Sequence, residues 1–120
     1  KRSSFRPGAF TDDELEVYRH AWSNVDSMRA GINYYRLVSR RLPAILSFYK
    51  KNKVKCPVCV VWGEKDRFLS LPLTEGLERW CDSSPEVHVI PNCGHWISQE
   101  APDELYEIIM NFIAKVGNSS

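Results

Sequence analysis

The sequence has no long apolar segment, no excess of charge of one sign and no second close pair of cysteines. No stretch approaches the roughly 20 apolar residues that a transmembrane helix needs, and no apolar core follows the basic N-terminus as in a signal peptide. The formal net charge is +1, and nothing in this balance of charges favours binding to nucleic acid or to a membrane surface. We therefore expect a cytoplasmic protein with no transmembrane segment and no nucleic-acid partner.

The four cysteines do not have the spacing of a metal site. Cys56 and Cys59 form a CxxC, but Cys81 and Cys93 do not supply the second close pair of a zinc site. A redox CxxC opens a helix, whereas this one leads into an apolar run typical of a strand. We expect reduced thiols in an intracellular protein and no bound metal.

The first 50 residues predict a loop followed by helices. Thr11 and Glu14 have the spacing of a capping box, and the helix that follows carries one apolar stripe, formed by Leu15, Tyr18 and Trp22. A second helix is predicted over about residues 26–40, because its apolar residues recur on one face. Pro43 is expected to break it, before a short apolar turn at 44–49 and a solvated loop.

The pattern changes after residue 53. Residues 58–62 and 87–90 predict two short strands, the first apolar throughout as in a parallel sheet covered on both faces. Residues 73–81 predict a helix with Leu77 and Trp80 turned inward. A last helix is expected to begin at Pro102, where apolar residues recur with helical spacing, and to end at Gly117. Strand, helix, strand and helix in this order predict the tail of a doubly wound α/β fold, whose earlier strands lie outside this chain.

Two loops follow the predicted strands and hold the candidate catalytic residues. Asp66 and Glu64 follow the first strand, and His95 follows the second, 29 positions after Asp66. Functional groups of open α/β sheets gather at the carboxyl ends of strands, so an acid and a histidine are expected within hydrogen-bonding reach there. The spacing does not decide between Asp66 and Glu64. His20, on a helix, and His88, within a strand, lack such a setting.

Three segments resemble the α/β-hydrolase superfamily, and within it the epoxide hydrolases and haloalkane dehalogenases. Residues 57–66 (PVCVVWGEKD) are similar to the strand and acid-bearing turn of these enzymes, residues 92–96 (NCGHW) to their histidine loop, and the helix after Pro102 to their last helix. The resemblance selects Asp66 as the acid of a catalytic triad. It also implies that residues 1–50 end a helical cap (lid) domain and that residues 51–120 are the C-terminal portion of the core.

One further segment separates the epoxide hydrolases from the dehalogenases. Residues 32–36 (INYYR) are similar to the cap segment of epoxide hydrolases whose tyrosine points into the active site, and the matching residue is Tyr35. The resemblance implies that a carboxylate opens an epoxide, that Tyr35 stabilises the leaving oxygen, and that His95 activates the water that hydrolyses the ester. Phe68, Leu69 and Trp96 would line a pocket for a small apolar epoxide. No cofactor is implied.

The sequence departs from this family in one respect, because neither the nucleophile nor the oxyanion-hole loop is present. We expect the chain alone to be inactive, as a fragment whose missing N-terminal half is a second chain or the rest of the parent chain. The alternatives are a haloalkane dehalogenase or a serine esterase of the same fold, which differ in their nucleophile, and a non-catalytic ligand-binding fragment.

Overall fold

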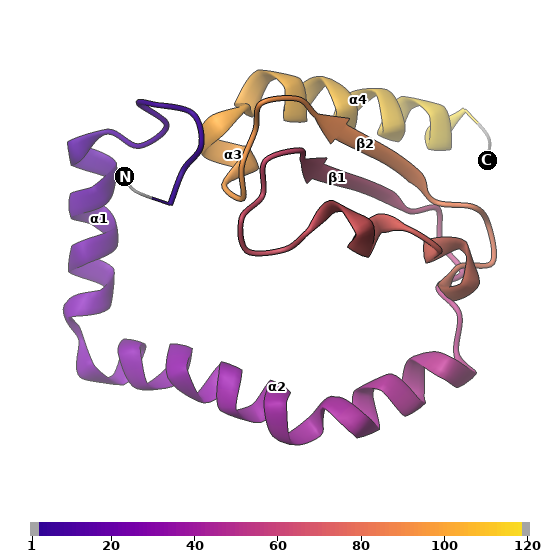
Figure 1. Ribbon diagram of the computed structural model, residues 1–120, viewed down its shortest axis with the longest axis horizontal. Coiled ribbons are helices and arrows are strands. Elements are labelled where there is room, and N and C mark those ends of the chain that lie inside the picture. Colours follow the sequence, from indigo (N-terminus) through magenta and orange to yellow (C-terminus); the bar gives the residue numbers. More distant parts are fainter. Residues whose placement is uncertain (1–2, 119–120) are drawn as a thin grey trace. The chain divides into compact units, whose positions relative to one another are not determined.

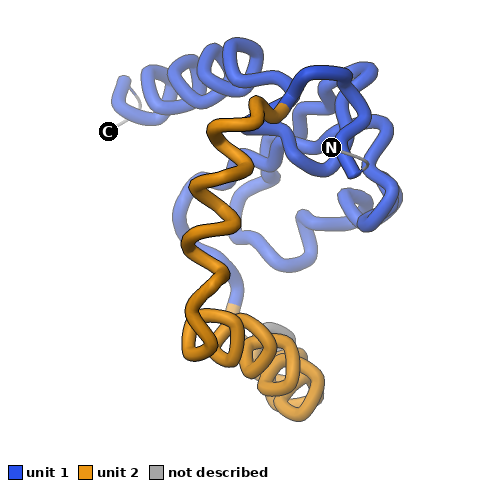
Figure 2. Tube along the Cα trace, turned by 90° about the vertical axis from the view of Figure 1, so that its left-hand side faces the viewer, with its two compact units in different colours: residues 1–9, 53–120 blue, residues 10–52 orange. Residues whose placement is uncertain are grey.

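The computed structural model describes residues 3–118 of the chain and divides it into two compact units. Unit 1 comprises residues 1–9 together with 53–120, and unit 2 comprises residues 10–52. Figure 2 shows unit 1 in blue and unit 2 in orange. The assignment of residues 1–50 to a cap and 51–120 to a hydrolase core stays a prediction, because this division follows from contacts within the chain only.

Unit 1 contains the predicted parallel sheet. Strand β1 (Cys59–Gly63) pairs with strand β2 (Glu86–Ile90) in parallel, from Cys59 opposite Glu86 to Gly63 opposite Ile90. Both predicted strands are thus confirmed to within a residue at each end. Residues 59–62 are half-buried rather than buried, because among the described residues β1 has only one neighbouring strand.

The last helix covers this sheet and encloses a small core. Helix α4 (Pro102–Gly117) begins at the predicted proline, ends at the predicted glycine and packs against β1 (Figure 1). A helix of one turn that the sequence analysis did not predict, α3 (Ile97–Glu100), precedes it. The buried residues of the core are Ile90, Cys93 and Ala101, and Val61, Ile97 and Ile108 pack around them. The core therefore includes a residue of the loop that follows β2, Cys93.

The helix predicted at residues 73–81 is wrong in its extent. Two separate 3₁₀ turns, η1 (Leu71–Thr74) and η2 (Leu77–Trp80), replace it. Gly76 lies between them with a φ of 70°, a left-handed conformation that interrupts any right-handed helix and that glycine adopts without steric cost. Leu77 and Trp80 are half-buried in η2.

Unit 2 consists of two helices, of which the first begins as predicted. Helix α1 (Asp12–Ser23) starts with a complete capping box, in which the Glu14 N–H donates to Thr11 Oγ1 over 3.2 Å and the Thr11 N–H donates to Glu14 Oε2 over 2.8 Å. Asn24 then caps helix α2 (Val25–Lys51), accepting a hydrogen bond from the Asp26 N–H. The capping chemistry of these side chains thus sets where each helix begins.

The prediction that Pro43 ends the second helix is wrong, since α2 continues through it to Lys51. A proline inside a helix leaves the carbonyl four residues earlier, here that of Ser39, without its N–H donor. Ser39 is exposed, so water can hydrate this carbonyl, and α2 bends along its length (Figure 1). Within residues 3–118, no helix is both long enough and apolar enough to cross a membrane.

Candidate functional site

The loops after β1 and β2 lie against each other at the carboxyl edge of the sheet. The Glu64 N–H donates to the Ile90 carbonyl over 3.0 Å, and the Lys65 N–H donates to the Cys93 carbonyl over 2.8 Å. Gly63 makes this contact possible, because a Cβ atom there would lie 2.6 Å from the Cys93 carbonyl oxygen and still closer to that of Gly94. The two loops are therefore joined by backbone contacts that leave no room for a side chain at residue 63.

Asp66 and His95 meet where these loops join. His95 Nδ1 lies 2.8 Å from Asp66 Oδ2, and the second carboxylate oxygen, Oδ1, accepts from the N–H groups of Phe68 at 2.8 Å and Leu69 at 3.0 Å. Burial raises the pKa of Asp66, but the hydrogen bonds from Leu69, His95 and Phe68 outweigh it, so this pKa lies below its ordinary value of 3.8. The acid is therefore ionised at neutral pH.

The ionised acid fixes the tautomer of the histidine. A carboxylate can only accept a hydrogen bond, so Nδ1 of His95 must carry the proton that points at Asp66. In the neutral ring, Nε2 then carries the lone pair, and it has no hydrogen-bonding partner among the residues that the structure describes. The His95 side chain remains 33% exposed, so this nitrogen can act as a base toward water or a bound molecule.

Two aromatic rings contact that of the histidine. The centroids of Phe68 and Trp96 are 5.1 Å and 5.4 Å from that of the His95 ring, both in edge-to-face geometry. Phe68 and Leu69 are exposed, and the Leu69 carbonyl accepts a hydrogen bond from Trp62 Nε1 over 3.2 Å. The predicted lining residues therefore lie beside the acid–histidine pair, and their contact with a substrate stays a prediction.

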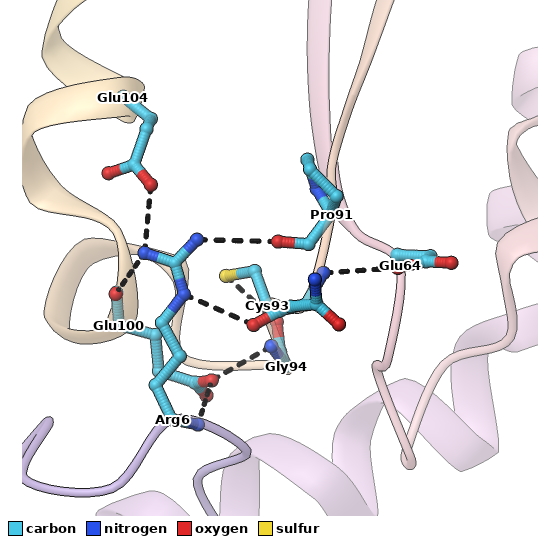
Figure 3. Close-up of polar contacts among 8 residues, drawn as sticks. Arg6, Glu64, Pro91, Cys93, Gly94, Glu100 and Glu104 are labelled. Carbon is cyan, nitrogen blue, oxygen red and sulfur yellow. Dashed lines mark hydrogen bonds and ion pairs between the residues drawn. The ribbon is translucent and has the colours of Figure 1, made fainter.

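Glu64, the competing acid, makes different contacts. Its Oε2 accepts from the Asn92 N–H over 3.0 Å (Figure 3). Its Oε1 lies 3.1 Å from Lys65 Nζ. The hydrogen bond from Asn92 is the main reason why the pKa of Glu64 lies below its ordinary value. Glu64 thus connects the two loops, and the carboxylate on His95 is that of Asp66.

The arrangement of parallel strands, acid turn and histidine loop agrees with the family comparison. Residues 1–108 match the model of the alpha/beta hydrolase family. The chain belongs to the alpha/beta hydrolase family. This membership confirms the superfamily and the fold class that the sequence segments predicted.

Two relatives show which hydrolases the chain resembles. It is 33% identical to epoxide hydrolase 3 of Mus musculus over 108 residues, which are 89% of this chain and 28% of the relative. It is 30% identical to 2-hydroxy-6-oxononadienedioate/2-hydroxy-6-oxononatrienedioate hydrolase of Comamonas testosteroni over 104 residues, 82% of this chain and 35% of the relative. The chain therefore spans about a third of the length of these two alpha/beta hydrolases.

A solved structure supports the fold independently of its function. The crystal structure of Cfl2 from Burkholderia cenocepacia matches with a TM-score of 0.80 at 24% identity, over 92% of this chain and 37% of that one. At this identity the match concerns the fold alone. The described helices and strands thus form part of an alpha/beta-hydrolase fold.

Tyr35 belongs to a different part of the chain from the acid–histidine pair. It lies on α2 in unit 2, it is 75% exposed, and its ring contacts that of Tyr34 edge-to-face at 5.5 Å between centroids. Asp66 and His95 belong to unit 1. The role of Tyr35 therefore stays a prediction.

The remaining candidate groups lie outside the pair. His20 is exposed on α1, and the His88 ring contacts Glu86 Oε1 at 2.8 Å. All four cysteines are free, and burial raises the pKa of Cys59 and of Cys93. Among residues 3–118, no group of three or more His, Cys, Asp or Glu residues is placed to hold a metal ion.

Sequence reasoning missed one buried carboxylate next to the site, that of Glu100. It is only 5% exposed, and it accepts hydrogen bonds from backbone N–H groups on both sides of His95 and from residues near the N-terminus. Its partners at residues 5 and 6 lie more than 90 positions away, so no local pattern marks them. The signal available in the sequence was a Glu between the histidine loop and Pro102, followed by the apolar Ala101.

Proposed function

We propose that the protein to which this chain belongs is an epoxide hydrolase, which converts epoxides to vicinal diols. The observation that carries the proposal is the 2.8 Å contact between His95 Nδ1 and Asp66 Oδ2, beside exposed Phe68 and Leu69. The identity of 33% with a protein named epoxide hydrolase 3 supports this class of substrate.

The first step of the proposed reaction forms an ester. A carboxylate nucleophile, supplied from outside these 120 residues, attacks one epoxide carbon, and the carbon–oxygen bond of the ring breaks. The ring oxygen becomes an alkoxide, which is unstable in apolar surroundings. Tyr35 donates a hydrogen bond to this oxygen and stabilises its developing charge. Phe68, Leu69 and Trp96 line the apolar part of the pocket.

The second step hydrolyses the ester and depends on the acid–histidine pair. Nε2 of His95 removes a proton from water, and the oxygen of that water attacks the ester carbonyl carbon. The bond between this carbon and the ester oxygen then breaks, and the proton on the imidazolium and the second proton of the attacking water pass to the two alkoxide oxygens, which releases the diol and regenerates the carboxylate and the neutral histidine. Asp66 keeps the ring oriented and stabilises the imidazolium that forms, and each epoxide consumes one water.

A second candidate is hydrolysis of a substrate of the kind named for the Comamonas testosteroni relative, which is 30% identical to this chain. The same acid–histidine pair can activate a serine nucleophile as well as a water. Residues 32–36 favour the epoxide, because their resemblance to an epoxide hydrolase cap segment provides Tyr35 as a donor to the opening ring.

The test is diol formation from an aromatic terminal epoxide by the longest polypeptide that contains this chain. We expect conversion to the diol, and we expect His95→Gln to stop at the ester, so that its mass rises by that of one epoxide. His20→Gln, which changes an exposed histidine of α1, is the matched control and should turn over normally. Folded protein that converts none of several epoxides and forms no adduct would contradict the proposal and favour the second candidate.

A further inference from the structure

The Glu100 carboxylate collects backbone N–H groups from two distant segments. Its Oε2 accepts from Phe5 at 3.0 Å, Arg6 at 2.9 Å and Gly94 at 2.8 Å, and its Oε1 accepts from Trp96 at 3.3 Å. Glu100 is only 5% exposed, and a buried carboxylate is stable only when hydrogen-bond donors replace its contacts with water. Burial raises the pKa of Glu100, but these four hydrogen bonds outweigh it and keep the group ionised.

Two of these donors flank the candidate catalytic base. Gly94 and Trp96 immediately precede and follow His95, so Glu100 holds the peptide groups on both sides of that residue. Gly94 lies so close that a Cβ atom there would be 2.8 Å from Glu100 Oε1. The Glu100 side chain therefore holds the backbone on both sides of His95, and with it the direction of the imidazole.

Arg6 anchors the same loop at its two ends. Its Nε donates to the Asn92 carbonyl over 3.1 Å and its Nη2 to the Pro91 carbonyl over 3.3 Å, where β2 ends. Its Nη1 donates to the Glu100 carbonyl and to Glu104 Oε1, both over 2.8 Å. Figure 3 shows this guanidinium between the end of β2 and the start of α4. One planar group thus spans the beginning and the end of residues 91–100.

We propose that Glu100 is a positioning residue for His95, holding its two neighbouring peptide groups so that the imidazole stays on Asp66, and that Arg6 fixes the loop around it. The proposal rests on the proposed function in that His95 is taken as the base. Glu100 touches no reacting atom and acts through the backbone.

The chemistry of the contact requires a carboxylate. Four N–H groups point at two oxygens, and the Oε2 atom alone receives three of them. A glutamine offers a single oxygen, and its NH₂ group would face an N–H donor, leaving that donor buried without an acceptor. Glu100→Gln is therefore expected to lose either the hydrogen bond from Trp96 or those from Phe5, Arg6 and Gly94, depending on which way the amide turns, while it changes the volume of the side chain very little.

The first measurement needs no substrate. In the longest polypeptide that contains this chain, solvent exchange of the His95 Nδ1 proton is followed by NMR, together with circular dichroism to confirm folding. We expect Glu100→Gln to speed this exchange at least about tenfold, because the ring leaves Asp66 more often. Glu107→Gln, which removes the same charge from an exposed position of α4, is the control and should leave it unchanged.

The second measurement is turnover. A displacement of about 1 Å can cost about 100-fold in rate, so we expect Glu100→Gln to lower kcat 10- to 100-fold with KM nearly unchanged. Glu100→Asp keeps both oxygens and should recover part of the loss, which a merely space-filling role would not explain. Unchanged exchange of the His95 proton in Glu100→Gln would overturn the proposal.

If Glu100→Gln does not fold, a second variant tests the same proposal. Arg6→Lys preserves the carboxylate and the charge but removes part of the planar donor set, and it should speed the same exchange more than Glu107→Gln does; equal exchange in the two would count against the proposal. If the unaltered protein hydrolyses no epoxide, the proposed function fails, while the exchange measurements still decide whether Glu100 positions His95.

Discussion

The loop that carries His95 and the two helices of unit 2 are held in order by different means. Polar side chains fix the loop at both ends, and Cys93 within it is completely buried. Helix α1 has no buried residue, and most large apolar side chains of the unit are exposed, among them Tyr18, Trp22, Val25, Met28, Ile32, Tyr34, Tyr35, Leu37, Leu42 and Phe48. The site around His95 therefore has its own framework, whereas the apolar faces of unit 2 are not covered within that unit.

The comparison shows which step of the proposed mechanism depends on a geometry that contacts within unit 1 determine. The distance between Asp66 and His95 follows from strand register, turn hydrogen bonds and the Glu100 contacts, all within unit 1. Among the described residues, no comparable contact fixes the orientation of Tyr35, whose ring contacts that of the adjacent Tyr34. Substitutions at Gly63 and Glu100 should therefore act through the geometry of the site, and a substitution at residue 35 only through its own hydroxyl group.

The largest effect is expected for Asp66→Asn, which changes the hydrogen bond to His95 in unit 1. The asparagine can turn its NH₂ group toward Nδ1 and favour the tautomer whose Nε2 is protonated and cannot act as a base. By analogy with triad acids, the hydrolytic rate should fall about 10⁴-fold, while formation of the ester is much less affected. Single-turnover kinetics on an aromatic epoxide would measure both steps. Glu64→Gln, in the same loop, is the control, and an equal loss in the two variants would contradict the assignment of the acid.

The next effect concerns stability rather than rate. Gly63→Ala would place a Cβ atom 2.6 Å from the Cys93 carbonyl, between two backbones that cannot separate without losing the loop contacts. We expect a loss of about 3 kcal/mol in the free energy of unfolding, measured with urea. Gly117→Ala, where nothing lies within 4 Å of the added atom, should change it little. Similar losses in both variants would show that the contact between the loops does not limit stability.

The smallest effect is expected for a substitution in unit 2, at Tyr35. Tyr35→Phe removes only the phenolic hydroxyl, and the resemblance implies a second donor outside this chain, so the rate of ester formation should fall about 10- to 100-fold. Tyr34→Phe is the matched control because Tyr34 is its exposed neighbour on the same helix. An unchanged single-turnover rate in Tyr35→Phe would remove this tyrosine from the mechanism.

Much of the fold follows from local patterns in the sequence. The capping box at Thr11, the two strands and the last helix are each set by neighbours a few residues apart, and the structure contains them as predicted. The contact between Asp66 and His95 was predicted because parallel strands bring the loops at their carboxyl ends together.

The errors have a different origin. The effect of Pro43 depended on whether water could reach the freed carbonyl of Ser39, and that of Gly76 on a left-handed conformation that composition alone does not reveal. Glu100 was missed because its partners come from the far end of the chain. Such contacts are properties of the folded chain and leave no periodic trace in the sequence.

Unit 2 is an insertion, because residues 3–9 and 53–118 belong to one unit and residues 10–52 lie between them. The hydrogen bonds from Phe5 and Arg6 to Glu100 join the chain before the insertion to the chain after it. They therefore close a large loop that contains the insertion. The entropy cost of closing a flexible loop grows slowly, by about 0.6 kcal/mol for each doubling of its length. An insertion of another length could therefore occupy the same place in the chain at little thermodynamic cost, while the contacts of Phe5 and Arg6 with Glu100 are kept.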